Sequence, residues 1–136
     1  MPRSYALRPG LLPGLLWLLL WLLLWATCAP AEVAVPPLTA RVTDLVGVLD
    51  TATSAALEAK LGAFEAERGT QIALLVLPTT EDEPIEMFGL RVAEAWRLGR
   101  EKLDDGALLI VATADRRVRI EVGYGLEGVL TDATSK

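Results

Sequence analysis

Residues 107–122 read ALLIVATADRRVRIEV, and this stretch decides the fold. Its first part, 107–113, is a continuous apolar run, which predicts a central strand covered on both faces. In residues 118–122 apolar and charged side chains alternate, which predicts a strand with one apolar face. Because only the short turn 114–117 separates the two runs, these strands must pair antiparallel.

Two helices and another buried strand are predicted upstream of this hairpin. Asp50 is a typical N-cap and Gly69 a typical terminating glycine, and apolar residues recur between them at helical spacing. The run QIALLVL at 71–77 predicts a second central strand. A second helix is predicted from Pro84, which suits a first helical position, to Gly99.

The order helix, strand, helix, strand, strand predicts an α/β fold with helices packed on a small mixed sheet. A segment around Val42 is expected to add an edge strand. Thr131-Asp132 is typical of the cap of a further helix, which the end at Lys136 would truncate. We therefore expect one face of the sheet to be incompletely covered and to expose apolar side chains.

The N-terminal residues predict export. Two arginines precede the uncharged run LLPGLLWLLLWLLLW at 11–25, whose length is typical of a signal peptide rather than of a spanning helix. The small residues of Ala29-Pro30-Ala31 predict cleavage after Ala31. Two alternatives stay open, namely lipid attachment at Cys28 and retention of residues 1–31 as a membrane anchor.

Beyond the export segment, the sequence predicts a linker and one acidic domain. Residues 32–40, EVAVPPLTA, contain two prolines and are expected to form an extended linker, with the domain spanning 41–136. Removing residues 1–31 leaves 11 of the 13 basic residues and all 18 acidic ones, a net charge of −7. Because such a charge repels nucleic acid, no nucleic-acid partner is expected.

The residue types exclude several chemistries. The chain contains no histidine, and its single cysteine, Cys28, precedes the domain. Serine–histidine, cysteine–histidine and histidine–zinc sites are therefore excluded. Any metal site must consist of oxygen ligands, which favours calcium or magnesium. Without a disulfide, an ordinary apolar core must hold the domain together.

Two motifs near the hairpin favour structural roles. Residues 123–128 match G-x-G-x-x-G, but a dinucleotide fold needs this loop after its first strand and an acidic residue about 20 positions later. No dinucleotide is therefore expected, and the glycines predict a tight loop. The cluster of Arg116, Arg117 and Arg119 predicts a solvated basic face, with phosphate contact as the alternative.

Five acidic residues fall at the ends of predicted elements: Asp44, Asp104, Asp105, Glu127 and Asp132. Each is explained singly by the preference of acidic residues for turns and helix caps. Loops at strand ends can also converge, and clustered carboxylates repel one another unless a cation joins them. Sequence spacing does not decide between the two interpretations.

A combination of short motifs covers residues 41–136 in a fixed order. They are Val42-Thr43-Asp44-Leu45, Leu49-Asp50, Gln71-Ile72, Trp96-x-x-Gly99, Asp104-Asp105-Gly106, Leu108-Leu109, the run from Arg119 to Glu127, and Leu130-Thr131-Asp132. No single motif is specific, but the combination resembles the TPM-domain family, the YgcG-like exported proteins of bacteria and photosynthetic organelles. Two departures are the missing helix after Asp132 and the missing downstream membrane segment of many bacterial members.

The resemblance implies an αβα sandwich on a small mixed sheet and export, often with a membrane anchor. It carries the acidic positions of the family over to Asp44, Asp104, Asp105 and Asp132 as expected ligands of calcium or magnesium. Asp44 is the expected catalytic residue, as a nucleophile or as a base that orients water. Family members are described as weak acid phosphatases, as calcium-binding proteins, or as helpers in assembly or repair of membrane protein complexes.

Two functions are therefore expected. The leading one is an exported domain that binds a divalent cation and hydrolyses phosphomonoesters. The alternative is a non-catalytic module that docks on a membrane protein complex, with membrane association through residues 1–31 if they stay uncleaved.

Overall fold

The structure is a computed structural model, and it describes residues 11–25 and 32–128. The chain divides into two compact units, Met1–Ala31 and Glu32–Lys136. The first contains helix α1 (Leu11–Trp25), which coincides with the apolar run. No helix among the described residues is both long and apolar enough to cross a bilayer. Cys28 and the predicted cleavage site after Ala31 lie outside the described residues.

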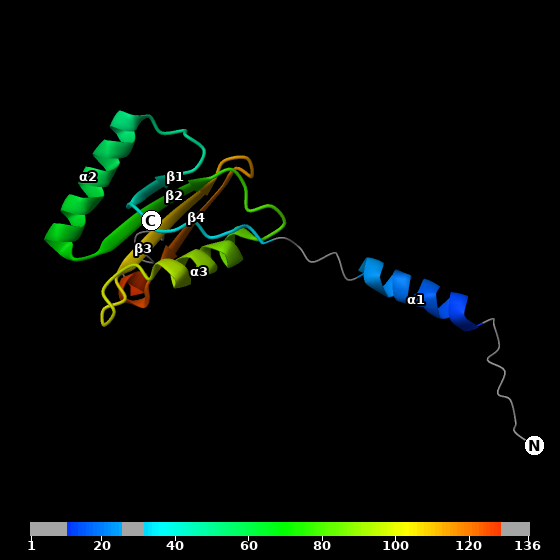
Figure 1. The fold of residues 1–136 in the computed structure, drawn as a ribbon. Coiled ribbons are helices and arrows are strands. Elements are labelled where there is room, and N and C mark those ends of the chain that lie inside the picture. The colour runs from blue at the N-terminus through cyan, green and yellow to red at the C-terminus, as the bar shows by residue number, and fades with distance from the viewer. Residues whose placement is uncertain (1–10, 26–31, 129–136) are drawn as a thin grey trace, which may run out of the picture. The chain divides into compact units, whose positions relative to one another are not determined.

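The second unit is built on a four-stranded mixed sheet of order β1-β2-β3-β4 (Figure 1). Strands β1 (Val42–Asp44), β2 (Gln71–Leu77) and β3 (Gly106–Ala112) run parallel to one another. Strand β4 (Arg117–Val122) pairs antiparallel with β3. The predicted hairpin, the two central strands and the mixed α/β architecture are therefore confirmed. The helix predicted at Thr131-Asp132 lies outside the described residues.

Helix α2 (Thr51–Arg68) begins and ends as its sequence predicts. The Oδ1 atom of Asp50 accepts a hydrogen bond from the N–H of Thr53 at 2.6 Å, which satisfies one of the unpaired donors of the first turn. Gly69 ends the helix with φ of 77°, a conformation that favours glycine. No residue of α2 is fully buried, so its apolar stripe is only half covered.

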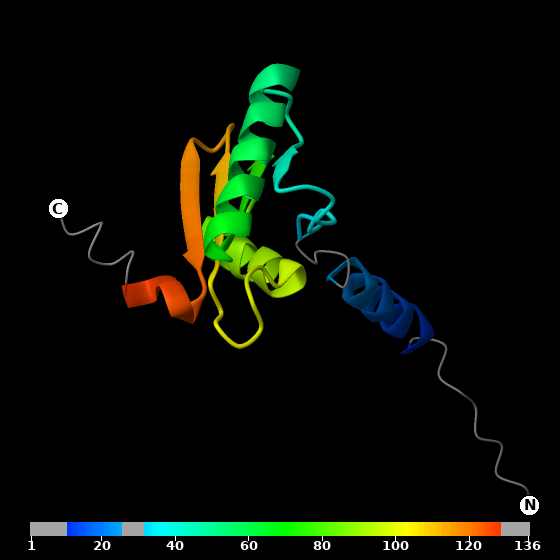
Figure 2. The same cartoon turned by 90° about the vertical axis from the view of Figure 1, so that its left-hand side faces the viewer.

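Helix α3 (Ile85–Trp96) supplies the main core from the other side of the sheet (Figures 1 and 2). Phe88, Val92 and Trp96 pack against alternate residues of β2 and β3, and Phe88 and Val92 are fully buried. Pro84 is the N-cap rather than the first helical residue. The helix ends at Arg97 with φ of 46°, before the predicted Gly99.

Residues 32–40 are extended, as predicted, but they belong to the compact domain rather than to a linker. The indole N–H of Trp96 donates to the Pro36 carbonyl at 2.8 Å, and the Arg91 guanidinium donates to the Val33 carbonyl at 2.9 Å. Val33 and Val35 pack against the core. The domain therefore begins at Glu32, and we call residues 32–40 the strap.

The sheet face opposite α3 is incompletely covered, as the sequence predicts. Val118 and Ile120 lie on β4 with 62% and 56% of their surface exposed. They are level with Val111 and Leu109 of β3, which are half-buried. An apolar row on β4 is thus open to solvent among the described residues.

Candidate functional site

Asp44 ends β1, and its carboxylate organises the loop that follows. Oδ1 accepts hydrogen bonds from the N–H groups of Val46 and Gly47 at 3.0 and 2.8 Å, and Oδ2 accepts one from Leu49 at 2.8 Å. Because these bonds, the one from Leu49 first, favour the charged form, they lower the pKa of Asp44. The carboxylate therefore holds the loop in one conformation.

Asp104 and Asp105 lie at the opposite end of the sheet from Asp44. Both β1 and β3 are parallel to β2, so the carboxyl end of β1 and the amino end of β3 face opposite edges. Asp44 is level with Val76, whereas β3 begins level with Gln71, which separates them by roughly 17 Å along β2. The expectation that these loops gather at one end is wrong, because it ignored the direction of the strands.

Asp105 is buried and paired with Arg100. Its Oδ1 accepts from the Arg100 backbone N–H at 2.8 Å, and its Oδ2 accepts from two guanidinium nitrogens at 2.9 and 2.5 Å. The guanidinium lowers the pKa of Asp105, and the carboxylate in turn raises the pKa of Arg100. This pair closes the loop between α3 and β3, so the carboxylate has a structural role here.

Asp104 links the loop before β3 to residues 123–125, which follow β4. Its Oδ2 accepts from the N–H of Tyr124 at 3.0 Å, and its carbonyl accepts from the N–H of Gly125 at 3.0 Å. A Cβ atom on Gly123 would collide with the Asp104 carbonyl, so glycine is required there by close approach of two backbones. Gly123 is thus the tight connection after β4, and residues 124–128 form a helical turn rather than the loop that the sequence predicts for the G-x-G-x-x-G pattern.

A cleft of about 610 Å³ opens beside Asp104 at this end of the sheet. Leu90 and Arg97 line it from α3 and its C-terminal end, and Glu121 and Tyr124 line it from β4 and the helical turn that follows. Tyr124 is 82% exposed, and Arg97 is also exposed. The cleft therefore offers an apolar wall together with charges of both signs.

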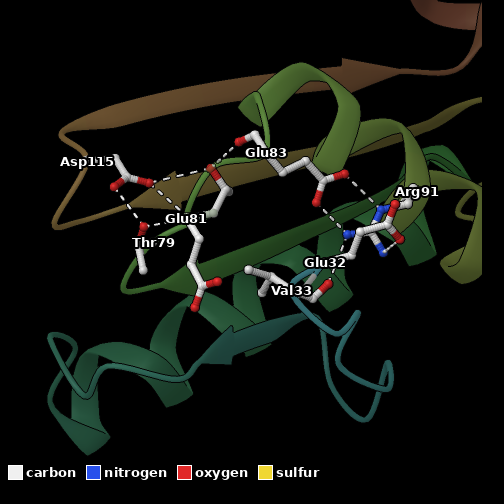
Figure 3. Close-up of polar contacts among 8 residues, drawn as sticks. Glu32, Val33, Thr79, Glu81, Glu83, Arg91 and Asp115 are labelled. Atoms are coloured by element: carbon white, nitrogen blue, oxygen red, sulfur yellow. Dashed lines mark hydrogen bonds and ion pairs between the residues drawn. The ribbon is translucent and has the colours of Figure 1, made fainter. Parts of the chain in front are cut away.

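Sequence reasoning missed a fourth carboxylate, Asp115, in the turn between β3 and β4. It accepts hydrogen bonds from the Thr79 hydroxyl at 2.8 Å and from the Thr80 N–H at 2.9 Å (Figure 3). The bond from Thr80 is the main cause of its lowered pKa. The available signal was the Thr79-Thr80 pair, which follows β2 after Pro78, at the edge where the hairpin turns.

Arg91 forms the other half of this polar region (Figure 3). Its guanidinium donates to both carboxylate oxygens of Glu83, at 2.9 and 2.5 Å, and lies 3.8 Å from the Glu32 carboxylate. The same group donates to the Val33 carbonyl. Arg91 therefore fixes the start of the strap to the loop that precedes α3.

The described residues contain no group of three or more carboxylates that could hold a metal ion. Asp132 lies outside them, and so the role of Asp44, Asp104, Asp105 and Asp132 as metal ligands stays a prediction. In the basic cluster, Arg119 donates to Glu121 at 2.7 Å, while Arg116 and Arg117 are exposed.

The comparisons with known proteins agree with this fold. A family model described as the TPM domain matches residues 42–136. The solution structure of the N-terminal domain of a protein from P. gingivalis has 40% sequence identity and a TM-score of 0.60, covering 66% of this chain and 57% of that one. The N-terminal domain of the cg2496 protein from Corynebacterium glutamicum has 17% identity and a TM-score of 0.58, covering 77% of this chain and 69% of that one. A comparison with curated proteins finds no match.

Proposed function

This chain belongs to the TPM domain family, and from that membership we propose that it is an exported, non-catalytic module that docks on a membrane protein. The observation that carries the proposal is the loop after β1. Its side chains Leu45, Val46 and Val48 are 55%, 40% and 57% exposed. A run of exposed apolar side chains on a soluble domain is typical of an interaction site.

The apolar loop is ordered before any partner arrives. Asp44 accepts three of its backbone N–H groups, and the N–H of Leu45 donates to the Val76 carbonyl at 2.8 Å. Binding through a preorganised loop costs less conformational entropy than binding through a flexible one. The Asp44 carboxylate therefore supports docking by fixing the loop rather than by chemistry.

The other aspartates favour the same proposal. Asp105 is paired with Arg100, and Asp115 accepts from two threonines. A nucleophile or a cation ligand needs lone pairs that point toward the substrate or the metal. The oxygens of these carboxylates instead accept hydrogen bonds from donors of the same chain.

Export is part of the proposal. The apolar helix α1 and the two arginines before it support a signal peptide or an anchor. Either one brings the domain to the outer face of a membrane, where a protein with an exposed apolar groove is the partner expected for the loop.

A photo-crosslinking residue placed at Val48 tests the proposal in the full-length chain in its own cells. Val48 is expected to cross-link one membrane protein at least about tenfold more than the control position Lys60, which is exposed on α2. Leu45→Asp should abolish the cross-link, because it places a charge in the apolar contact. Equal labelling from both positions, or labelling that survives Leu45→Asp, would contradict the proposal.

A metal-dependent phosphomonoesterase is the second candidate. The observation in its favour is the open cleft, which has the exposed Asp104 and Arg97 on its walls. A calcium or magnesium ion held there would offset the charge of a phosphate group.

Turnover of a generic phosphomonoester tests this second candidate. The expected result is activity that requires the metal and is lost with Asp104→Asn while the fold survives. If turnover is lost with Asp44→Asn but not with Asp104→Asn, catalysis belongs to Asp44 instead. Absence of turnover in the wild type would exclude the activity.

A further inference from the structure

β4 is an edge strand with a free outer side. The strand order ends at β4, and within residues 32–128 no strand pairs with its outer edge. Two of its apolar side chains, Val118 and Ile120, are more than half exposed. An exposed apolar edge strand is a template for pairing with another strand.

One hydrogen bond identifies which backbone groups of β4 face outward. The N–H of Gly123 donates to the Gly106 carbonyl at 2.8 Å, and hydrogen-bonded pairs alternate along an antiparallel ladder. Arg119 and Glu121 therefore bond to β3. The N–H and C=O groups of Val118, Ile120 and Val122 point away from the sheet.

We propose that β4 pairs antiparallel with β4 of a second copy of this chain, around a two-fold axis at Ile120. The axis is perpendicular to the sheet, so each face of one copy continues into the same face of the other. Ile120 exchanges two hydrogen bonds with its own counterpart, and Val118 does so with Val122 of the second copy. The two sheets then become continuous.

The charges on β4 select this register. In an antiparallel pair, directly opposed side chains lie on the same face, so Arg119 must oppose another residue of the α3 face. An axis at Ile120 places Arg119 opposite Glu121 of the second copy, twice. An axis at residue 119 opposes arginine to arginine, and one at residue 121 opposes glutamate to glutamate. An axis at residue 118 opposes Arg117 to Arg119. Among the axes at residues 118–121, only the one at Ile120 avoids like charges.

Helix α3 supports the same pairing. It packs over β4, and its residue Leu90 is 49% exposed and lines the cleft with Glu121 and Val122. Because the axis keeps the faces aligned, the α3 helices of the two copies flank it on one face. Leu90 then gains an apolar neighbour.

Cysteine cross-linking in the intact cell tests the geometry on the full-length chain. Cys28→Ser first removes the only native thiol. Ile120→Cys is then expected to form a disulfide-linked dimer, because directly opposed residues satisfy the distance that a disulfide needs. Val118→Cys is the matched control, since its two copies would lie roughly 13 Å apart along the strands. The expected yield is at least about tenfold higher for Ile120→Cys. Equal yields, or none from either variant, would overturn the proposal.

Charge reversal tests the register independently, again in the Ile120→Cys chain. Arg119→Glu and Glu121→Arg should each reduce the cross-linked dimer about tenfold, because each opposes like charges. Co-expression of these two variants, with different tags, should restore a mixed dimer, since every glutamate then meets an arginine of the other chain. Both variants lose the contact between Arg119 and Glu121 within the chain, so recovery in the mixture reports on the contact between chains. If the co-expressed variants give no more cross-linked dimer than either variant alone, the proposed pairing is overturned. This result is expected if the outer edge of β4 binds an extended segment of another protein instead.

Discussion

The two ends of the central sheet are closed in different ways. At the amino end of β3, backbones approach each other so closely that only glycine fits, as at Gly106 against Leu98 and at Gly123 against Asp104. At the carboxyl end, Asp44 and Asp115 accept hydrogen bonds from loop backbone and threonine groups. The amino end is therefore held by close backbone packing together with the pair of Asp105 and Arg100, and the carboxyl end by polar side chains that leave apolar loop residues exposed.

The largest expected effect comes from breaking the amino end. Gly106→Ala should lower the free energy of unfolding by about 3 kcal/mol, because its Cβ atom would collide with the Leu98 carbonyl and one backbone must move. Gly47→Ala at the carboxyl end should cost only about 1 kcal/mol, since it has φ of 77° but open space around it. Urea denaturation of the two variants measures the difference. Equal losses of unfolding free energy in the two variants would show that the two ends of the sheet are held in the same way.

A smaller effect is expected from Asp44→Asn at the carboxyl end. The amide keeps one acceptor oxygen but presents an NH₂ group where Oδ2 accepts from Leu49, which should cost about 1–3 kcal/mol. Asp82→Asn, in an exposed loop, is the control for loss of one charge. Hydrogen exchange of the Leu49 amide should rise in Asp44→Asn and stay unchanged in the control. If hydrogen exchange of the Leu49 amide is unchanged in both variants, Asp44 does not hold the loop in its conformation.

The pH dependence of stability should report on the pair of Asp105 and Arg100 at the amino end. Arg100 lowers the pKa of Asp105 in the folded state, so this carboxylate contributes stability above its unfolded pKa of about 4. That contribution is lost as the pH falls through the lower folded-state pKa. Thermal midpoints between about pH 5 and pH 2 should therefore fall more steeply in the wild type than in Asp105→Asn. Parallel curves would show that the pair with Arg100 does not stabilise the fold.

The smallest effect concerns a cation, which the phosphomonoesterase candidate requires in the cleft beside Asp104. Calcium at a concentration equal to its dissociation constant should add about 0.4 kcal/mol. Calorimetry should find that Asp104→Asn removes this gain and Asp44→Asn keeps it, because these residues lie at opposite ends of the sheet. The reverse pattern would move the cation to the carboxyl end.

Local patterns predicted the elements well, since each depends on neighbouring residues. The caps Asp50 and Gly69 define α2, and the run 71–77 is β2 as expected. The arrangement of the aspartates was not predictable from spacing, because it depends on strand direction. The strap was mistaken for a linker because its partners are distant in sequence, as Trp96 is 60 positions from Pro36.

The strap also determines how the domain would respond to a pulling force. Tension applied through the chain before Glu32 reaches the bonds of the strap one after another, first that of Val33 with Arg91 and then that of Pro36 with Trp96. Bonds loaded in sequence break at lower force than bonds loaded together. Peeling the strap would release roughly 30 Å of chain before β1 bears any load. Release of the strap would thus protect the folded core from a brief pulling force.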